Sequence, residues 1–516
     1  MRGSQHDLFS AESREDHEKR GKGSMNFNSL SFLLFLPLVV CLYWCLPHKF
    51  RWILLLIASY YFYMCWNVKL IFLILTTTAV SYVSGLCMER ASNIRIKKLM
   101  LGITLFVCLG LLVFFKYADF LLQSIVGALN FFGADIVGIS LNILLPVGIS
   151  FYTFQTLSYV IDVYRGKIRA ERHFGYFALF VSYFPQLVAG PIERPENLLP
   201  QLKSPQNLDG ENVKTGLKFL VSGFVQKCVI ADFCGIYVDK VYANLASSNA
   251  LAVFIASGLF LIQMYNDFAG YSEIAMGAAR LMGVKLTRNF NEPLRSKSYT
   301  EFFRRWHITL NQWFTDYVYI PLGGSRKGKL RKIVNTLVVF FLCGLWHGAD
   351  WTYVLWGLTA GIFVCAESVL KKPALKLCGK LHIRPDSGIL PLLRWGIVMV
   401  LFSLSAILFR AQSISEIITA FNRIFTANGF GTGYWSECAE QLGLNAGKLL
   451  LLLLSLSVMI LLPKLTECNH ALFLGEKRVL ISETTGAMFF GIFCIAFCWL
   501  ALLSQTDASG FQYFQF

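Results

Sequence analysis

The stretch Phe341–Gly357, FLCGLWHGADWTYVLWG, has the composition of a membrane helix but contains an ionisable side chain near its centre. Most of its residues are apolar or glycine, yet His347 stands in the middle and Asp350 follows closely. Ionisable groups are costly inside a bilayer, so those that occur there are candidates for function. Gly344 and Gly348 lie four residues apart, a spacing that permits a close approach between helices.

The composition of the whole chain agrees with this local pattern. Of its 516 residues, 55% are hydrophobic and only 15% are charged, well under the roughly 25% of an ordinary soluble domain. A soluble protein this apolar could not cover its own surface. We therefore expect an all-α polytopic membrane protein, because helices satisfy their backbone hydrogen bonds within each span.

Segments apolar enough to span a bilayer recur along the chain and predict roughly ten to twelve transmembrane helices. They lie near residues 30–46, 51–66, 68–87, 99–121, 173–189, 214–238, 250–266, 333–347, 350–370, 391–409, 447–463 and 484–504.

The formal net charge of +16 is carried largely by short basic stretches between apolar runs. This arrangement is typical of cytoplasmic loops that face anionic lipid. It does not indicate a partner nucleic acid, because no basic motif lies on a soluble module. The basic stretches are Lys49 with Arg51, Arg90–Lys98, Arg326–Lys332 and Lys371–Lys380.

Residues 1–24 differ from the rest of the chain. They are polar, charge-balanced and almost free of aromatic residues, which predicts a disordered N-terminal extension or tag. Residues 25–516 are expected to form a single integral-membrane domain. No CxxC pair is followed by a second one among the 14 cysteines, so no metal site is predicted.

Two segments combine breaks with polar side chains. LPVGISFYTFQTLSYVIDVYRG (Leu145–Gly166) has a proline and a glycine at its start, and FPQLVAGPIERP (Phe184–Pro195) contains three prolines and Gln186. Irregular backbone at membrane depth survives where protein or a water-filled cavity satisfies it. We expect re-entrant or cavity-lining elements, and for the second segment an ordinary surface loop is the alternative.

A third segment, Ser296–Gly324, reads as one amphipathic helix at the interface or in a cavity. Ser298 and Glu301 form a capping-box pattern that predicts its start. One expected stripe on the helix is aromatic and apolar, and the other is polar. A surface helix with a solvated histidine is the alternative. The stripes are Phe303, Trp306, Leu310 and Trp313, and Arg304, His307, Asn311 and Thr315.

The role of each polar group stays open on the residues alone. Trp346 can shield the imidazole of His347 from water, and a neutral imidazole can act as a general base. A histidine bonded to a backbone carbonyl is an equal alternative. Asp267 and Glu273 interrupt another apolar run beside Tyr271. They can orient a histidine, hold an arginine, line a polar path or lie at a helix end at the membrane surface.

Five segments in this order resemble the membrane-bound O-acyltransferase (MBOAT) family, in its bacterial alginate O-acetyltransferase AlgI-like and DltB-like branch. The resemblance covers nearly all of residues 25–516. It rests on LPVGISFYTFQTLSYVIDVYRG, FPQLVAGPIERP, FAGYSEIAMGAARLMG, EFFRRWHITLNQWFTDYVYIPLGG and LCGLWHGADWTYVLWG.

The resemblance implies a ring of membrane helices around a tunnel, and acyl transfer from a thioester to a hydroxyl. It places the two catalytic positions at His347, as base or hydrogen-bonding residue, and at His307, which would orient the acyl carbonyl or the acceptor. The expected substrate-binding residues are Arg304, Arg305, Trp306, Asn311, Trp346, Asp267, Tyr271 and Gln186.

The expected substrates and partners follow from the same resemblance. The acyl donor is acetyl-CoA, with no bound cofactor, and the acceptor is an exported polysaccharide or cell-wall polymer. An extracytoplasmic SGNH-type partner would complete the transfer at the bacterial cytoplasmic membrane. The alternatives are D-alanyl transfer from a carrier-protein thioester to teichoic acid, and a non-catalytic transporter.

Overall fold

The computed structural model describes residues 25–467 apart from 138, 139, 142, 381, 383–386 and 427–432. In these residues every regular element is a helix, as the composition predicts. The expected extension over residues 1–24 and the predicted span at 484–504 lie outside the described residues.

Seven described helices are long and apolar enough to cross a membrane. An eighth span results if α19 (Tyr434–Leu442) and α20 (Ala446–Glu467), which are bent by 70° against each other, count as one. The protein is therefore a multi-pass membrane protein. The prediction of a span at 173–189 is wrong, because its helix α8 (Phe174–Ser182) ends after nine residues, just before Pro185.

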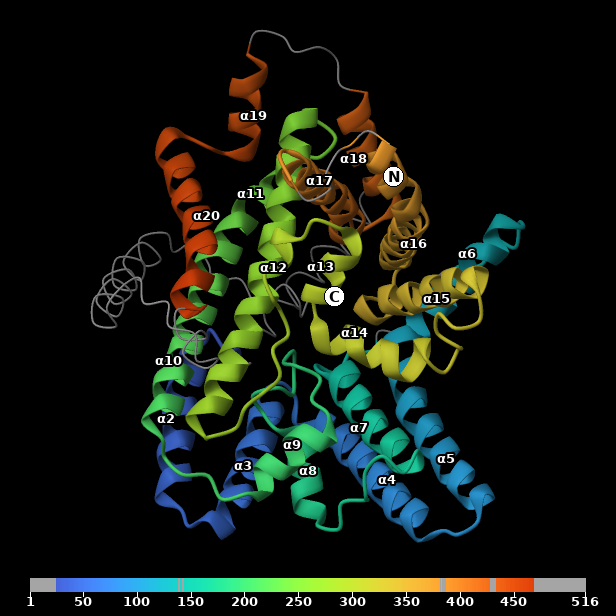
Figure 1. The fold of residues 1–516 in the computed structure, drawn as a ribbon, viewed down its shortest axis with the longest axis vertical. Coiled ribbons are helices and arrows are strands. Elements are labelled where there is room, and N and C mark those ends of the chain that lie inside the picture. Colours follow the sequence, from blue (N-terminus) through green and yellow to red (C-terminus); the bar gives the residue numbers. More distant parts are fainter. Residues whose placement is uncertain are drawn as a thin grey trace.

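One end of the molecule is a group of short and medium helices (Figure 1). The turn between α4 and α5 lies within the basic stretch Arg90–Lys98, and Lys49 and Arg51 lie in the first turn of α3. Helix α7 is buried along almost its whole length. The helices are α2 (Leu30–Cys45), α3 (His48–Met64), α4 (Ile71–Arg90), α5 (Ile94–Leu112), α7 (Ile149–Tyr164), α8 and α9 (Pro195–Lys203).

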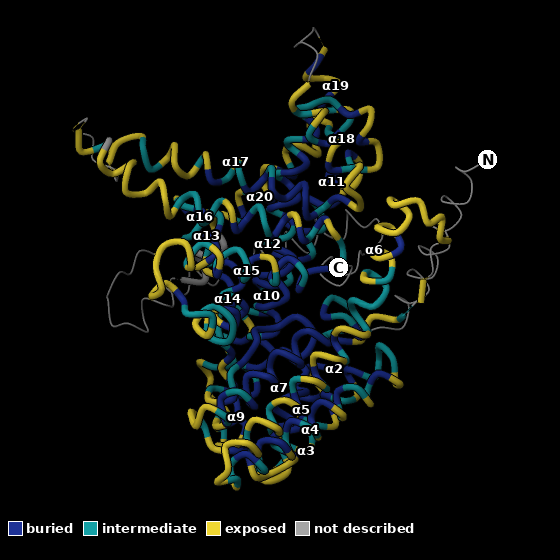
Figure 2. Tube along the Cα trace, turned by 90° about the vertical axis from the view of Figure 1, so that its right-hand side faces the viewer, coloured by how far each residue is buried: buried dark blue, intermediate teal, exposed yellow. Residues whose placement is uncertain are grey.

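A central helix, α12 (Ala250–Leu281), connects the two ends of the molecule (Figure 1). It packs against neighbours on several sides, and Figure 2 shows the buried chain concentrated around it. Outward side chains such as Leu34 and Phe106 are exposed, which suits a surface that faces lipid. The neighbours of α12 are α10 (Gly210–Phe224), the π-helix Val225–Ala231, α11 (Asp232–Ala243), α17 (Leu390–Arg410), α18 (Ile414–Phe425) and α19.

The middle of the molecule holds shorter elements and two helices that cross closely (Figure 1). Gly344 lies where these two helices meet: a Cβ there would be 3.3 Å from the Cα of Gly357 and would also overlap the carbonyl oxygen of Tyr353. The elements of this layer are α6 (Ala118–Phe131), α13 (Tyr299–Arg305), α14 (Ile308–Phe314), the π-helix Thr315–Tyr319, α15 (Lys329–His347) and α16 (Trp351–Lys380).

The two segments with breaks are buried. The chain from Tyr183 to Glu193 is non-helical yet buried at every residue, and Gly148 adopts a left-handed conformation (φ 74°) at the start of α7. The burial excludes the surface-loop alternative for the second segment. Irregular backbone at this depth is tolerated because protein satisfies it: the amide of Phe184, for example, donates to the hydroxyl of Ser59 (3.0 Å).

Candidate active site

The segment predicted as one amphipathic helix is broken at its histidine. α13 begins as expected, since the side chain of Ser298 accepts from the amide of Glu301 (3.0 Å). The helix ends at Arg305, and α14 starts at Ile308. His307 lies between them with a left-handed backbone (φ 41°, ψ 55°). The prediction of continuous stripes across this point is therefore wrong. A non-glycine residue held in this region costs free energy and is often found at functional sites.

Long-range hydrogen bonds stabilise the break. The amide of Asn291 donates to the carbonyl oxygen of Arg305 (2.9 Å), and the amide of Ile308 donates to that of Asn289 (2.8 Å). Asn311 donates its side-chain amide to two carbonyl oxygens at the end of α13 (2.7 and 2.6 Å). Backbone groups that an unbroken helix would satisfy internally are thus satisfied by an extended segment and one side chain.

The hydrogen bonds around His307 define its neutral tautomer. Its Nδ1 lies 3.1 Å from Oδ1 of Asn289. The same Oδ1 accepts from the backbone amide of Thr309 (3.3 Å) and from its hydroxyl (2.9 Å). A backbone amide can only donate, so this atom of Asn289 is the oxygen, and Nδ1 of His307 must donate to it. Nε2 of neutral His307 therefore carries the lone pair, and it makes no hydrogen bond with the described residues.

The fold brings the two predicted histidines against one indole ring. The ring centroid of Trp346 lies 5.4 Å from that of His307 and 5.0 Å from that of His347, edge-to-face in both cases. Both histidines are buried. Rings of Trp356 and Phe409 lie 5.1 and 5.2 Å from His347. The pair is thus enclosed by aromatic side chains that limit access of water.

A buried carboxylate fixes the irregular segment next to this site. Glu193 accepts from the amide and the hydroxyl of Thr287 and from the side chain of Asn197 (2.6 Å). Burial raises the pKa of this carboxyl, and the hydrogen bond from the amide of Thr287 opposes the rise. The amide of Ile192 donates to the Thr309 hydroxyl (3.0 Å), which links this segment to the hydrogen bonds of His307.

The predicted substrate-binding residues of α13 and α14 have different surroundings. Arg304 is exposed, whereas Arg305 pairs with Glu301 (2.8 Å). Trp306 is buried against neighbouring rings, and Asn311 stabilises the backbone break. Among the eight predicted binding residues, Trp346 contacts the rings of both histidines.

The other three predicted binding residues are buried in separate contacts. Asp267 pairs with Lys227 (2.8 Å), which also pairs with Asp232 (2.7 Å). Tyr271 stacks on an aromatic ring near the start of the described chain, with centroids 4.3 Å apart. Gln186, in the buried irregular segment, donates to the carbonyl oxygen of Phe180 on α8 (3.2 Å).

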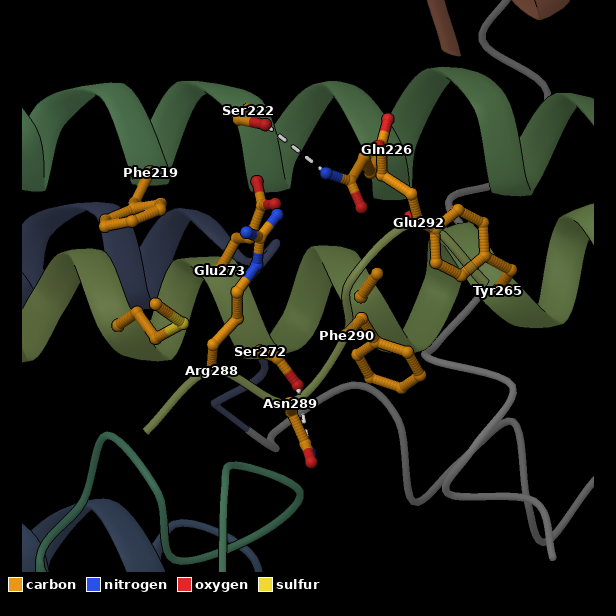
Figure 3. A pocket seen from close by; sticks show the side chains of 12 residues that line it. Phe219, Ser222, Gln226, Tyr265, Ser272, Glu273, Arg288, Asn289, Phe290 and Glu292 are labelled. Carbon is orange, nitrogen blue, oxygen red and sulfur yellow. Dashed lines mark hydrogen bonds between the residues drawn. The ribbon is translucent and has the colours of Figure 1, made fainter. Parts of the chain in front are cut away.

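The sequence analysis did not single out Asn289 or Thr309, which hold His307. Asn289 also lines a polar pocket between α10, α12 and the extended segment 288–292, as Figure 3 shows. Ser272 lies beside Asn289 at the edge of this pocket, and Glu273 and Arg288 line it. An asparagine in an extended segment between helices gives little indication in the sequence of a functional role, because its hydrogen-bond partners are distant along the chain.

Together these features define a class of protein: a multi-pass helical membrane protein with two histidines buried around a tryptophan in its middle layer. Residues 169–373 match the model of the membrane-bound O-acyltransferase family. The chain is 34% identical to a probable alginate O-acetylase AlgI of Pseudomonas putida, over 95% of this chain and 100% of that protein.

Two further relatives are named for other activities. A peptidoglycan O-acetyltransferase of Helicobacter pylori is 31% identical over 75% of this chain and 76% of the relative. A teichoic acid D-alanyltransferase of Streptococcus thermophilus is 30% identical over 44% of this chain and 58% of the relative. The chain belongs to the membrane-bound O-acyltransferase family and is an O-acyltransferase.

Proposed function

We propose that the protein transfers acetyl from acetyl-CoA towards an exported polysaccharide or cell-wall polymer, by way of a partner protein. The observation that carries this proposal is the pair His307 and His347 around Trp346, in a chain related along most of its length to O-acetyltransferases. In this proposal the protein lies in the bacterial cytoplasmic membrane and passes the acetyl group to a partner of the SGNH type.

The chemical step needs a base for a hydroxyl group. His347 would take the hydroxyl proton while the oxygen attacks the carbonyl carbon of the thioester, and the C–S bond then breaks to release the thiol. The enclosing rings would limit hydrolysis of the thioester by water. His347, on the last turn of α15, and its neighbour Trp346 are thus the centre of the proposed reaction.

The tautomer of His307 favours one of its two expected roles. Because Nδ1 donates to Asn289, neutral His307 offers a lone pair at Nε2 and no second donor. A lone pair can accept the hydrogen of an acceptor hydroxyl, but it cannot stabilise the oxygen of an acyl carbonyl. We therefore assign His307 to orientation of the acceptor and not of the acyl group.

Two observations favour acetyl-CoA as the acyl donor. The acetyltransferase relatives cover three quarters or more of the chain, whereas the D-alanyltransferase relative covers 44%. The exposed Arg304 and the basic stretch 326–332 offer positive charge to the phosphates of coenzyme A. A carrier-protein thioester remains the second candidate donor, because a D-alanyltransferase is among the relatives.

The test is transfer of radiolabelled acetyl from acetyl-CoA in membranes that contain this protein and the products of its neighbouring genes. His347→Ala and His307→Ala are compared with wild type at equal expression. His48→Ala is the matched control, since this histidine lies at the start of α3 and its hydrogen bond within the described residues is with the carbonyl oxygen of Lys203. We expect both site variants to lose roughly 100-fold or more of the transfer rate, which is the usual scale for general-base catalysis, and the control to keep it.

Two results would contradict the proposal. Equal labelling in wild type and His347→Ala would remove this histidine from the reaction. Labelling by D-alanine from a charged carrier protein, with none from acetyl-CoA, would replace the proposed donor with the second candidate.

A further inference from the structure

A lysine at membrane depth lies next to the last turn of α15, the turn that carries His347, and it has no role in the reaction proposed above. Lys116 is in the apolar segment Ile94–Phe131, which has the length and hydropathy of a span. It lies on the π-helix Val113–Tyr117 between α5 and α6. A charged residue at membrane depth is costly and π-helical turns are frequent at functional sites, so both features call for a reason.

Two side chains of this π-helix donate hydrogen bonds to the end of α15. The ammonium group of Lys116 donates to the carbonyl oxygen of Trp346 and lies 3.4 Å from that of His347. The hydroxyl of Tyr117 donates to the carbonyl oxygen of Leu345 (2.8 Å). Three successive carbonyl groups in the last turn of α15 thus find donors on a segment about 230 residues away in sequence.

These carbonyl groups have no partners of their own inside the helix, because the last four of any helix lack the next turn. The helix dipole also makes this end negative, which favours a cation there. Within the part of the chain that the structure describes, the contacts of the Lys116 ammonium are with backbone oxygens and the face of Trp346, and none is with a carboxylate. The helix end itself is therefore the group that compensates its charge.

Helix α6, which follows the π-helix, also contacts the start of α16. The indole nitrogen of Trp351, at the start of α16, donates to the hydroxyl of Ser124 on α6 (3.2 Å), and its ring lies 5.5 Å from that of Phe120. The short connection after His347 is thus held on both sides by the segment that follows α5. Figure 1 shows this segment passing α15 in the middle layer.

We propose that Lys116, with Tyr117, is a positioning element for acyl transfer: it fixes the last turn of α15 so that the His347 imidazole stays at reacting distance. The inference rests on the proposed role of His347. Lys116 touches the backbone that carries this histidine, so it acts through His347 and is not assigned to the substrate.

The test compares three lysine variants in the acetyl-transfer assay. Lys116→Met keeps the length of the side chain but removes the donor, and Lys116→Arg keeps a cation with donors. Lys98→Met, an exposed lysine near the start of α5, is the matched control. For Lys116→Met we expect kcat to fall about 100-fold, the scale of a misplaced catalytic group, with KM for acetyl-CoA unchanged within about twofold. We expect Lys116→Arg to stay within about tenfold of wild type.

A second readout does not depend on the donor. Carbethoxylation of His347 by diethyl pyrocarbonate, followed by peptide mass spectrometry, reports how firmly this imidazole is held and covered. We expect Lys116→Met to raise the rate several-fold at His347 and to leave His307 unchanged. If wild type transfers no acetyl, the proposed donor fails while this readout still tests the positioning.

Three results would overturn the inference. They are wild-type kcat in Lys116→Met, a loss in Lys116→Arg as large as in Lys116→Met, or an unchanged modification rate at His347. If Lys116→Met does not fold, Tyr117→Phe decides, because it removes only one hydroxyl; we expect a loss of about threefold to tenfold from a single hydrogen bond. Wild-type activity in that variant would equally contradict the proposal.

Discussion

Asn289 is bonded to His307, to the backbone amide of Thr309 and to its hydroxyl through a single oxygen atom. The backbone amide identifies this atom as the acceptor, and the tautomer of His307 follows from it. Because Nε2 of His307 then carries only a lone pair, it can accept a hydrogen bond from a hydroxyl but cannot donate one to a carbonyl oxygen. One buried amide thus separates the roles of two histidines that look equivalent in the sequence.

Replacing Asn289 by leucine tests this point at the scale of one residue. Leucine has a side-chain shape close to that of asparagine but no hydrogen-bond acceptor. The proton of His307 is then no longer fixed on Nδ1, and the imidazole ring is free to turn. We expect the transfer rate to fall about 100-fold and the free energy of unfolding to fall by about 1–3 kcal/mol from the buried donors left unpaired. Initial rates and thermal unfolding in detergent measure the two effects.

Ser272→Ala is the control for Asn289→Leu, since Ser272 meets the other end of the same amide at a longer distance (3.5 Å). We expect its rate to stay near that of wild type. A rate in Asn289→Leu equal to that of the control would show that the tautomer of His307 does not matter for transfer.

The two histidines could be singled out from the sequence, but several of their partners could not. An ionisable residue in an apolar segment is visible without a structure, and this identified His347 and Asp267. Lys116 carries the same signal within the predicted span 99–121, so it could have been found in this way. Asn289 carries no such signal, because its significance comes from contacts with residues 18 and 20 positions away.

At the scale of elements, α15 and α16 cross with two glycines in contact. A Cβ on Gly344 would lie 3.3 Å from the Cα of Gly357. A Cβ on Gly357 would lie 3.0 Å from the Cα of Gly344 and would overlap the carbonyl oxygen of Phe340. The sequence predicts a close approach at Gly344 and Gly348. In the structure Gly344 meets Gly357, whereas Gly348 faces the ring of Tyr353.

Gly344→Ala should separate these two helices. The added methyl group would overlap backbone atoms of α16, which cannot move as a flexible side chain could. We expect a loss of about 1–3 kcal/mol in the free energy of unfolding, typical of overpacking. We also expect a fall in transfer rate of at least about tenfold, because His347 lies one turn away. Unfolding in detergent and initial rates measure both.

Gly102→Ala on α5 controls for the substitution itself, because nothing lies within 4 Å of the position of its Cβ. There we expect no loss of stability, since alanine is favoured over glycine in a helix interior by about 0.5–1 kcal/mol. Equal behaviour of the two variants would contradict the importance of the crossing at Gly344.

Helix starts were easier to predict than helix breaks. The Ser298–Glu301 pattern contains its own hydrogen-bond partners within four residues, and the start of α13 was predicted correctly. The break at His307 depends on the extended segment 289–291 and on Asn311. Local periodicity therefore predicts an unbroken helix through His307. It carries no information on the distant backbone groups that take over the hydrogen bonds there.

At the scale of the molecule, basic residues gather in the helix connections of one end. The turn between α4 and α5, within Arg90–Lys98, lies at one end, and the acidic helix α19 lies at the other (Figure 1). The connection from α7 to α8 adds Arg165, Lys167 and Arg172 to the basic end. Basic loops stay on the cytoplasmic side of a membrane. We therefore predict that the basic end faces the cytoplasm, where acetyl-CoA would be supplied, and that α19 faces outward.

Two cysteine variants test this orientation in intact cells. Lys98→Cys marks the basic end and Ser436→Cys marks α19, and both positions are exposed. Because a membrane-impermeant maleimide reaches outward sites alone, we expect it to label Ser436→Cys in intact cells and Lys98→Cys only after permeabilisation. Wild type, with its own cysteines, gives the background. The reverse pattern would place the acidic end in the cytoplasm, so that a donor from the cytoplasm would have to reach His347 from the side of α19.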